Sequence, residues 1–186
     1  MAVRISSVDG DTLGDIFEGC RSCVYWERPE RFRQSAAGEG ANLKSEWFET
    51  TAAQFDPCGK LLYVDDEPAA YCQYAPPQYV PGVSRYDGLA RRLDKDGVLI
   101  TCLCVSEKHQ RKGLGRRLLR EVIEDMRRRK IKSLETFARD DSANNCSGPT
   151  RFYLAQGFSV IATETYPEGG SYSLVRMEIA QRDAGA

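Results

Sequence analysis

The sequence predicts one domain of the α/β class, with mixed α and β elements over residues 1–186. Two observations support this prediction. Short apolar runs typical of strands alternate along the chain with segments whose apolar residues recur at helical spacing. The hydrophobic content of 41% and the charged content of 28% are those of an ordinary globular protein, long enough to bury one substantial core.

The charge balance and the amino terminus argue against several classes of protein. Lys and Arg number 26 and Asp and Glu 27, so the chain has no basic surplus of the kind that favours nonspecific nucleic-acid binding. The first residues contain no apolar signal-peptide core, and no run approaches the roughly 18 apolar residues of a membrane helix. We therefore expect a cytoplasmic protein without nucleic-acid or membrane partners. Its seven cysteines are expected to be reduced thiols.

The first helix is expected at Thr12, because Asp15 stands three residues further on, which is the spacing of a capping box. Apolar residues then recur at helical intervals as far as Val24, which predicts one continuous helix. The other elements expected are strands at 3–8, 61–64, 69–75, 98–105, 132–138, 159–164 and 173–179, and helices at 44–55, 114–126 and 148–156.

Two segments in the middle of the chain have unusual properties. Residues 76–97 are long for a connection, which makes them a candidate lid or wall of an acceptor site. Residues 98–105 ("VLITCLCV") form a continuous apolar run between Gly97 and Ser106. Such a strand is buried on both faces, so we expect it at the centre of the sheet.

A glycine-containing basic turn, "HQRKGLGRR" at residues 109–117, joins this strand to the most regular helix of the chain. Unpaired N–H groups and the positive end of the helix dipole meet at such a helix start, and together they bind anions. Gly113 and Gly115 allow the backbone to approach a phosphate closely. The spacing fits neither the P-loop nor the dinucleotide fingerprint. The turn therefore predicts a phosphate cradle of another type.

Two motifs resemble those of the GNAT acetyltransferase superfamily. "VSEKHQRKGLGRRLL" resembles its acetyl-CoA signature, and "FYLAQGF" resembles its late helix, in which a tyrosine stands four residues before a Gly-Phe pair. The resemblance covers nearly the whole chain and extends to an actinobacterial-type subgroup of these enzymes. It implies a mixed, mostly antiparallel sheet that is splayed at the acetyl-CoA site and flanked by helices on both faces.

The resemblance also implies where acetyl-CoA binds. The pantetheine arm would pair with the backbone of the central strand, and the pyrophosphate would lie on the backbone of the turn. One further contact is implied by the asparagine that the family places seven residues before the tyrosine. Cys146 occupies that position here, so its neighbour Asn145 is the expected substitute. The implied cofactor-binding residues are Leu103, Cys104, Val105, Gln110, Arg111, Lys112, Gly113, Leu114, Gly115, Arg116 and Asn145.

The implied chemistry is direct transfer of an acetyl group to a primary amine in a ternary complex. Tyr153 takes the place of the family's tyrosine and would act as the general acid toward the leaving thiolate. The backbone N–H of Val105 would stabilise the oxyanion. The partners expected are acetyl-CoA and an amine-bearing acceptor, and a homodimer is left open.

The general base is left open among three alternatives. Many relatives have a glutamate on the central strand, but residues 98–105 contain no carboxylate. The alternatives are Glu67 in the hairpin turn, Asp87 in the long segment, and a chain of water molecules. His109 has a suitable pKa in its free form, but its place in the phosphate turn favours a role beside the phosphate.

Two features support other functions. Cys20 and Cys23 are three residues apart on an expected helix and so share a face, as half of a zinc site or a redox pair requires, although no second pair completes a metal site. The missing strand carboxylate favours a noncatalytic acyl-CoA-binding or interaction module. Four aromatic residues are candidates for an acceptor pocket or for ordinary core positions, namely Tyr25, Trp26, Tyr79 and Tyr86.

Overall fold

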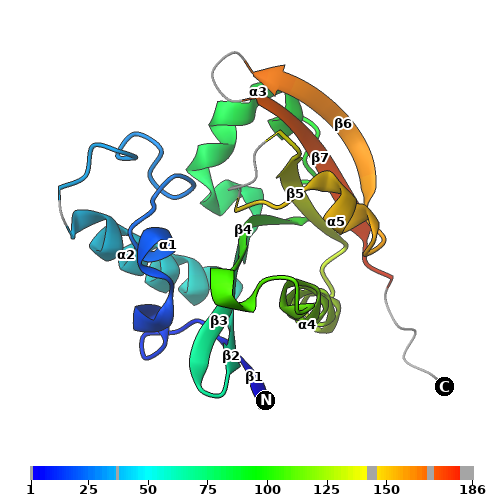
Figure 1. Cartoon of the computed structure of the whole chain (residues 1–186). Coiled ribbons are helices and arrows are strands. Elements are labelled where there is room, and N and C mark those ends of the chain that lie inside the picture. Colours follow the sequence, from blue (N-terminus) through cyan, green and yellow to red (C-terminus); the bar gives the residue numbers. More distant parts are fainter. Residues whose placement is uncertain (1, 37, 142–145, 167–169, 181–186) are drawn as a thin grey trace.

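A computed structural model describes residues 2–36, 38–141, 146–166 and 170–180, which form a twisted seven-stranded sheet with helices on both faces (Figure 1). The strands lie in the order β1-β2-β3-β4-β5-β7-β6. Their bounds are β1 Val3–Ser7, β2 Gly59–Val64, β3 Glu67–Ala75, β4 Val98–Val105, β5 Ser133–Arg139, β6 Ser159–Tyr166 and β7 Gly170–Glu178.

All neighbouring strands in this sheet are antiparallel except β4 and β5. The expected hairpin is confirmed, and Asp65 and Asp66 at its tip have positive φ values of 49° and 66°, as a type I′ turn requires. Strand β4 has the bounds expected from the sequence and lies fourth of seven. The mixed, mostly antiparallel sheet is therefore confirmed.

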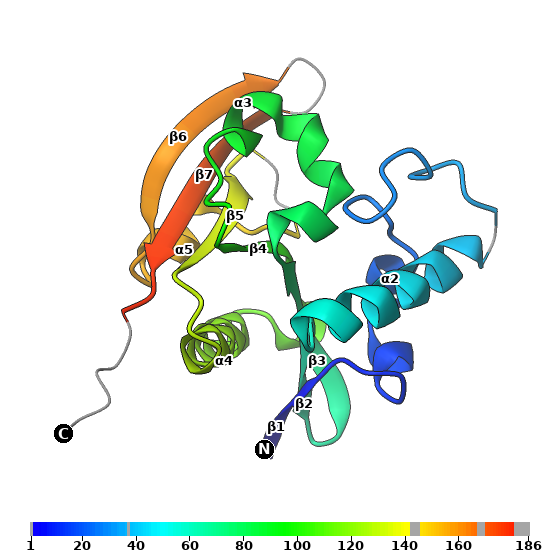
Figure 2. The same cartoon turned by 180° about the vertical axis from the view of Figure 1, so that it is seen from behind.

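The helices cover the sheet in two layers (Figures 1 and 2). On one face, α4 (Leu114–Arg128) and α5 (Thr150–Leu154) pack on a core that includes Leu118, Val122 and Tyr153. On the other face lie α1 (Glu18–Arg21), α2 (Glu39–Phe55) and α3 (Asp87–Ala90), over a core that includes Trp47 and Phe137.

The helix expected from Thr12 to Val24 is wrong. The chain forms a 3₁₀ turn at Leu13–Asp15, becomes extended at Ile16 with ψ 135°, and resumes as the four residues of α1. The Thr12 side chain does not cap this turn. Its Oγ1 accepts the N–H of Asp9, and the Asp9 carboxylate accepts the N–H of Thr12 instead. The capping spacing therefore belongs to a tight local turn.

The long segment at 76–97 is not an irregular loop. It contains 3₁₀ helices at Pro77–Tyr79 and Pro81–Tyr86 and then α3, and Gly82 donates its N–H to the carbonyl of Trp26 at 2.8 Å. This contact docks the segment on the chain that follows α1.

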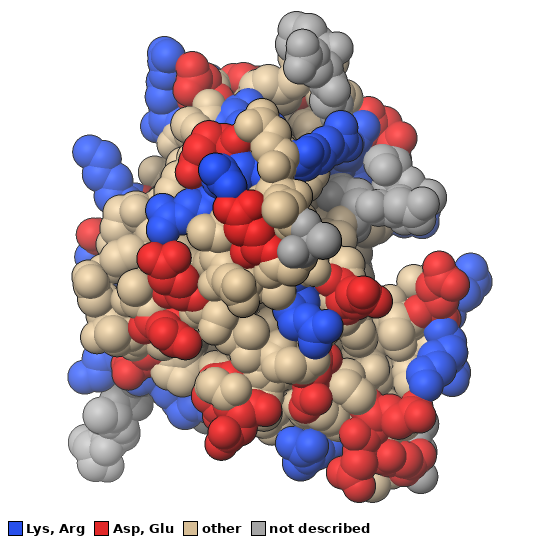
Figure 3. All heavy atoms as spheres, turned by 90° about the vertical axis from the view of Figure 1, so that its left-hand side faces the viewer, with Lys and Arg blue, Asp and Glu red and all other residues tan. Residues whose placement is uncertain are grey.

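The surface agrees with the near-equal numbers of acidic and basic residues. On the face shown in Figure 3, Lys and Arg side chains are interspersed with Asp and Glu. Among the described residues, no helix has both the length and the apolar character needed to cross a membrane.

Candidate active site

The candidate site begins where β4 and β5 separate. The two strands pair only between Val98–Ile100 and Leu134–Thr136, and the second half of β4 has no pairing with β5. Ser106 donates its N–H to Ala69 of β3, so the N–H of Val105 points the other way, into the split, because N–H directions alternate along a strand. The splayed sheet expected beside the central strand is thus present.

The turn after β4 brings several backbone N–H groups to the same place. A 3₁₀ helix at Glu107–His109 is followed by Arg111 and Gly113 in the left-handed region, with φ values of 60° and 79°, and α4 begins at Leu114. The first N–H groups of α4 have no partner within the helix. A Cβ atom added at Gly113 would meet nothing within 4 Å. The backbone there is open to a ligand, as a phosphate cradle requires.

The split and the turn are joined by one cleft of about 720 Å³. Nine of the eleven residues expected to bind acetyl-CoA line it. They are Leu103, Cys104, Val105, Gln110, Arg111, Gly113, Leu114, Gly115 and Arg116. Lys112 does not line it, because its ammonium donates to the carbonyl of Lys108 at 2.8 Å. Asn145 lies outside the described residues.

A second hollow of about 510 Å³ shares Gly113 and Arg116 with this cleft. Its walls also contain Arg117 and Arg120 of α4, together with Glu121 and Glu124. The start of α4 therefore presents basic side chains on both sides of Gly113, a suitable surface for a ligand with several phosphates.

The split is covered by the chain that precedes α5. The carbonyl of Cys146 accepts the N–H of Leu103 at 2.6 Å, and Cys146, Gly148 and Pro149 line the cleft opposite β4. Sequence reasoning missed this contact, which occupies one of the backbone groups that the resemblance assigns to the pantetheine arm.

Tyr153 lies immediately behind this covering chain. Its side chain is 0% exposed and does not line the cleft. A Cβ atom added at Gly148, which lines the cleft, would lie 3.8 Å from the Tyr153 hydroxyl. Burial raises the pKa of the phenol well above its usual value, so Tyr153 keeps its proton.

Neither of the two carboxylates considered as the general base lines the cleft. Glu67 is exposed and paired with Lys108, whose hydrogen bond lowers the pKa of that carboxyl. Asp87 is exposed at the start of α3. Among the described lining residues there is no carboxylate. His109 does line the cleft, but it is buried within the turn, with Nδ1 2.9 Å from the Ser106 hydroxyl.

Two of the aromatic candidates, Trp26 and Tyr86, are buried in the core, while Tyr25 and Tyr79 are half-buried against it. Trp26 and Tyr86 are buried and stack with a centroid distance of 5.6 Å, while the hydroxyls of Tyr25 and Tyr86 lie 2.8 Å apart. Tyr79 accepts the indole N–H of Trp47 at its carbonyl. These contacts are those of a packed aromatic core.

A buried ion pair lies on the same face and was also missed. Lys44 of α2 and Glu27 are each 1% exposed and pair with one another, and both hydrogen-bond to Gln73 of β3. Burial alone would lower the pKa of Lys44, but the Glu27 charge raises it overall. A signal existed in the sequence, because Lys44 shares the apolar face of α2 with Trp47, Phe48 and Thr51.

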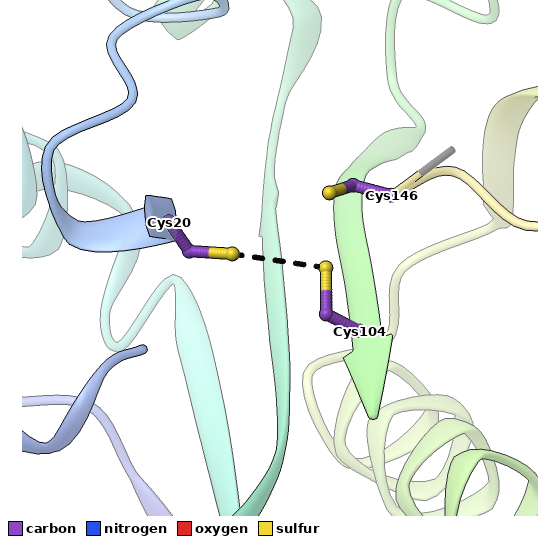
Figure 4. Close-up of side chains that lie close together, drawn as sticks. All are labelled: Cys20, Cys104 and Cys146. Carbon is purple, nitrogen blue, oxygen red and sulfur yellow. Dashed lines mark hydrogen bonds between the residues drawn. The ribbon is translucent and has the colours of Figure 1, made fainter. Parts of the chain in front are cut away.

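Three cysteines meet at the edge of the split. The sulfur atoms of Cys20, Cys104 and Cys146 all lie within 4.8 Å of one another, and the Cys20 thiol contacts that of Cys104 at 3.8 Å (Figure 4). Hydrogen bonds from Cys104 and Cys20 lower the pKa of the Cys146 thiol. Cys23, which the sequence pairs with Cys20, does not belong to this cluster.

The fold and the cleft together place an open strand edge and a basic helix start on one elongated cleft. A comparison with family models matches residues 21–158 to the family described as "Acetyltransferase (GNAT) family". The chain therefore belongs to this family, and it is an acetyltransferase with acetyl-CoA as its cosubstrate. A comparison with curated proteins finds no match.

Solved structures share the fold at low sequence identity. The ribosomal-protein-S18-alanine N-acetyltransferase from Escherichia coli is 16% identical over 100% of this chain and 99% of its own, with a TM-score of 0.60. YncA from Salmonella typhimurium, solved with acetyl-CoA, is 18% identical over 100% and 99%, with a TM-score of 0.64. The PaiA N-acetyltransferase from Thermoplasma acidophilum, solved with coenzyme A, is 12% identical over 96% and 99%, with a TM-score of 0.59.

Proposed function

We propose that the protein transfers an acetyl group from acetyl-CoA to a primary amine by direct attack in a ternary complex. The observation that carries this proposal is the single cleft that connects the open half of β4 with the N-terminus of α4. The family membership favours this activity over a noncatalytic acyl-CoA-binding module. An amine acceptor is compatible with direct attack, because a neutral amine attacks a thioester without a covalent enzyme intermediate and requires only proton transfers.

The pyrophosphate would lie on the N–H groups from Arg111 to Arg116. Support comes from the open space at Gly113 and from the arginines that line the cleft and the adjoining hollow. Lys112 would contribute its backbone N–H alone, since its side chain is directed to Lys108. The nucleotide end of the ligand then meets Arg117 and Arg120.

The pantetheine arm would pair with β4 between Leu103 and Val105. The Leu103 N–H is already bonded to Cys146, so the arm reaches this group only after the covering chain has moved. The N–H of Val105 faces the split and would stabilise the oxyanion. Tyr153 would protonate the departing thiolate; support comes from burial, which keeps its phenol protonated, and from the 3.8 Å between its hydroxyl and the Cβ position of Gly148 in the cleft wall.

The proton of the acceptor ammonium would leave through water. Glu67 and Asp87 lie away from the cleft, and the described lining residues include one imidazole, that of His109, and no carboxylate. Its imidazole is held by Ser106 inside the turn that would bind the pyrophosphate. This placement favours a structural role for His109.

The test is turnover of Tyr153→Phe with a panel of primary amines. We expect thiol release from acetyl-CoA to fall by about 10²- to 10⁴-fold, the usual contribution of a general acid, while acetyl-CoA affinity is retained. Tyr74→Phe is the matched control, because Tyr74 is also fully buried but its hydroxyl donates to Asp125. Unchanged turnover in Tyr153→Phe would remove Tyr153 from the acid role.

Initial-rate kinetics test the ternary complex. Double-reciprocal lines for acetyl-CoA and the amine should intersect. Parallel lines would indicate an acetylated enzyme and contradict direct attack.

A further inference from the structure

The three-cysteine cluster has the composition of a metal site. Cys20 comes from α1, Cys104 from β4 and Cys146 from the chain that precedes α5, and the three side chains point toward one another (Figure 4). All three are free thiols. Their separation is that of thiols in contact, since a disulfide requires sulfur atoms about 2.05 Å apart. Three thiols from three separate segments therefore converge without a covalent bond.

The spacing of the sulfur atoms suits a zinc ion. Zinc binds thiolates at about 2.3 Å in tetrahedral geometry, which places neighbouring sulfur atoms about 3.8 Å apart. The Sγ atoms of Cys20 and Cys104 are 3.8 Å apart, and Cys146 lies within 4.8 Å of both. A shift of about 1 Å in Cys146, which is exposed and precedes a short helix, completes a three-sulfur face.

The cluster also has an entry path and an open side. Cys104 and Cys146 line the 720 Å³ cleft, so a cation reaches the sulfur atoms from solvent. With three protein thiolates, a zinc ion bound here would keep a fourth coordination position for water or an added ligand. The cluster contains Cys20 of the Cys20–Cys23 pair that the sequence suggests, but Cys104 and Cys146 take the place of Cys23.

We propose that Cys20, Cys104 and Cys146 bind one Zn²⁺ ion, and that the bound ion holds the covering chain closed against acetyl-CoA. Cys146 covers the split and bonds to the N–H of Leu103, which the pantetheine arm needs. A metal ion that joins Cys146 to Cys104 fixes this arrangement. The metal site is independent of the proposed acetyl transfer. The competition between zinc and acetyl-CoA rests on that proposed function.

The first experiment measures metal binding by the full chain in the presence of a non-thiol reductant. Zn²⁺ is titrated against a chromophoric chelator, and Co²⁺ serves as the spectroscopic probe. We expect one ion per chain and a thiolate-to-cobalt charge-transfer band. Cys20→Ser, Cys104→Ser and Cys146→Ser should each weaken binding by more than about 100-fold, the upper range for loss of an outer-shell partner.

Cys23→Ser is the matched control, because Cys23 is partly buried on the same segment as Cys20 but lies outside the cluster. It should bind Zn²⁺ as the unaltered chain does. The absence of a charge-transfer band, or equal loss of binding in Cys23→Ser and Cys146→Ser, would overturn the metal site. Cys146→Ser alters an exposed residue, so the test stands even if a variant at Cys104 fails to fold.

The second experiment measures acetyl-CoA affinity by calorimetry with and without Zn²⁺. Zinc should weaken acetyl-CoA binding by at least about tenfold, or 1.4 kcal/mol, in the unaltered chain and leave Cys146→Ser unaffected. Equal affinities with and without bound zinc would overturn the competition. If the metal-free chain binds no acetyl-CoA, the proposed function fails while the metal site stands on the first experiment.

Discussion

The two faces of β4 are built in different ways. On the side of α4, one wall of the cleft is formed by a strand, a turn and a helix that follow one another in the chain, and the phosphate contacts proposed there are backbone N–H groups. On the side of α2, the core brings together side chains from Trp26, Lys44 and Tyr86, which are far apart in sequence. The difference teaches that backbone sites are encoded locally, whereas side-chain networks depend on the completed fold.

The largest effect on stability is expected on the side of β4 that packs against α2. Lys44→Met leaves Glu27 buried without its charge partner, and we expect the free energy of unfolding to fall by about 3–5 kcal/mol in chemical denaturation. Arg28→Met is the control, because the Arg28–Glu46 pair is exposed and worth at most about 1 kcal/mol. Equal losses of unfolding free energy in the two variants would show that the buried pair contributes no more to stability than the exposed pair.

The docking of residues 76–97 is tested at Gly82. A Cβ atom added there would lie 2.7 Å from the backbone of Tyr25 and Trp26, so Gly82→Ala should cost about 1–3 kcal/mol. Gly10→Ala is the control, since nothing lies within 4 Å of its Cβ position. Thermal unfolding measures both. A Gly82→Ala protein as stable as Gly10→Ala would contradict the close contact.

The cleft on the side of α4 is tested with two glycines that occupy equivalent positions at helix starts. Gly113 and Gly38 cap α4 and α2, with φ values of 79° and 82°, and both have open space at Cβ. Alanine at either position should cost about 1–2 kcal/mol of stability through left-handed strain. Only Gly113→Ala should also weaken acetyl-CoA binding, by at least about tenfold in calorimetry. Equal affinities in the two variants would argue against the cradle.

The smallest effect is expected at Glu67. Glu67→Gln removes an exposed pair with Lys108 and no group of the cleft, so turnover should change by less than about twofold. Its pH profile should keep rising toward the pKa of the acceptor amine, because water carries the proton. A large loss of turnover, recovered in Glu67→Asp, would restore Glu67 as the base.

Most of the cleft wall on the side of α4 could be predicted from the sequence. The bounds of β4, the turn with its two glycines and the start of α4 depend on residues that are neighbours in the chain, so local pattern defines them. The helix over 12–24 was wrong because Ile16 is held extended and buried, a tertiary effect that outweighs helical spacing.

The cysteine cluster could not be found from sequence. Cys20 is 84 residues from Cys104 and lies near Cys146 only after the sheet has formed. Spacing within one segment favoured Cys23 as the partner of Cys20, but the structure brings Cys20 to β4 instead. Lys44 differs in this respect, since a lysine on the apolar face of α2 is a signal that periodicity can detect.

The short pairing between β4 and β5 has a consequence for how the molecule opens. The sheet consists of two antiparallel halves, β1–β4 and β5–β7, joined by three residue pairs at Val98–Ile100. At the seam between the halves, the amide hydrogens of the open half of β4 should therefore exchange before those of the paired residues Val98–Ile100. Acetyl-CoA in the split would act as a removable strand between the halves, so its binding should slow exchange along the seam.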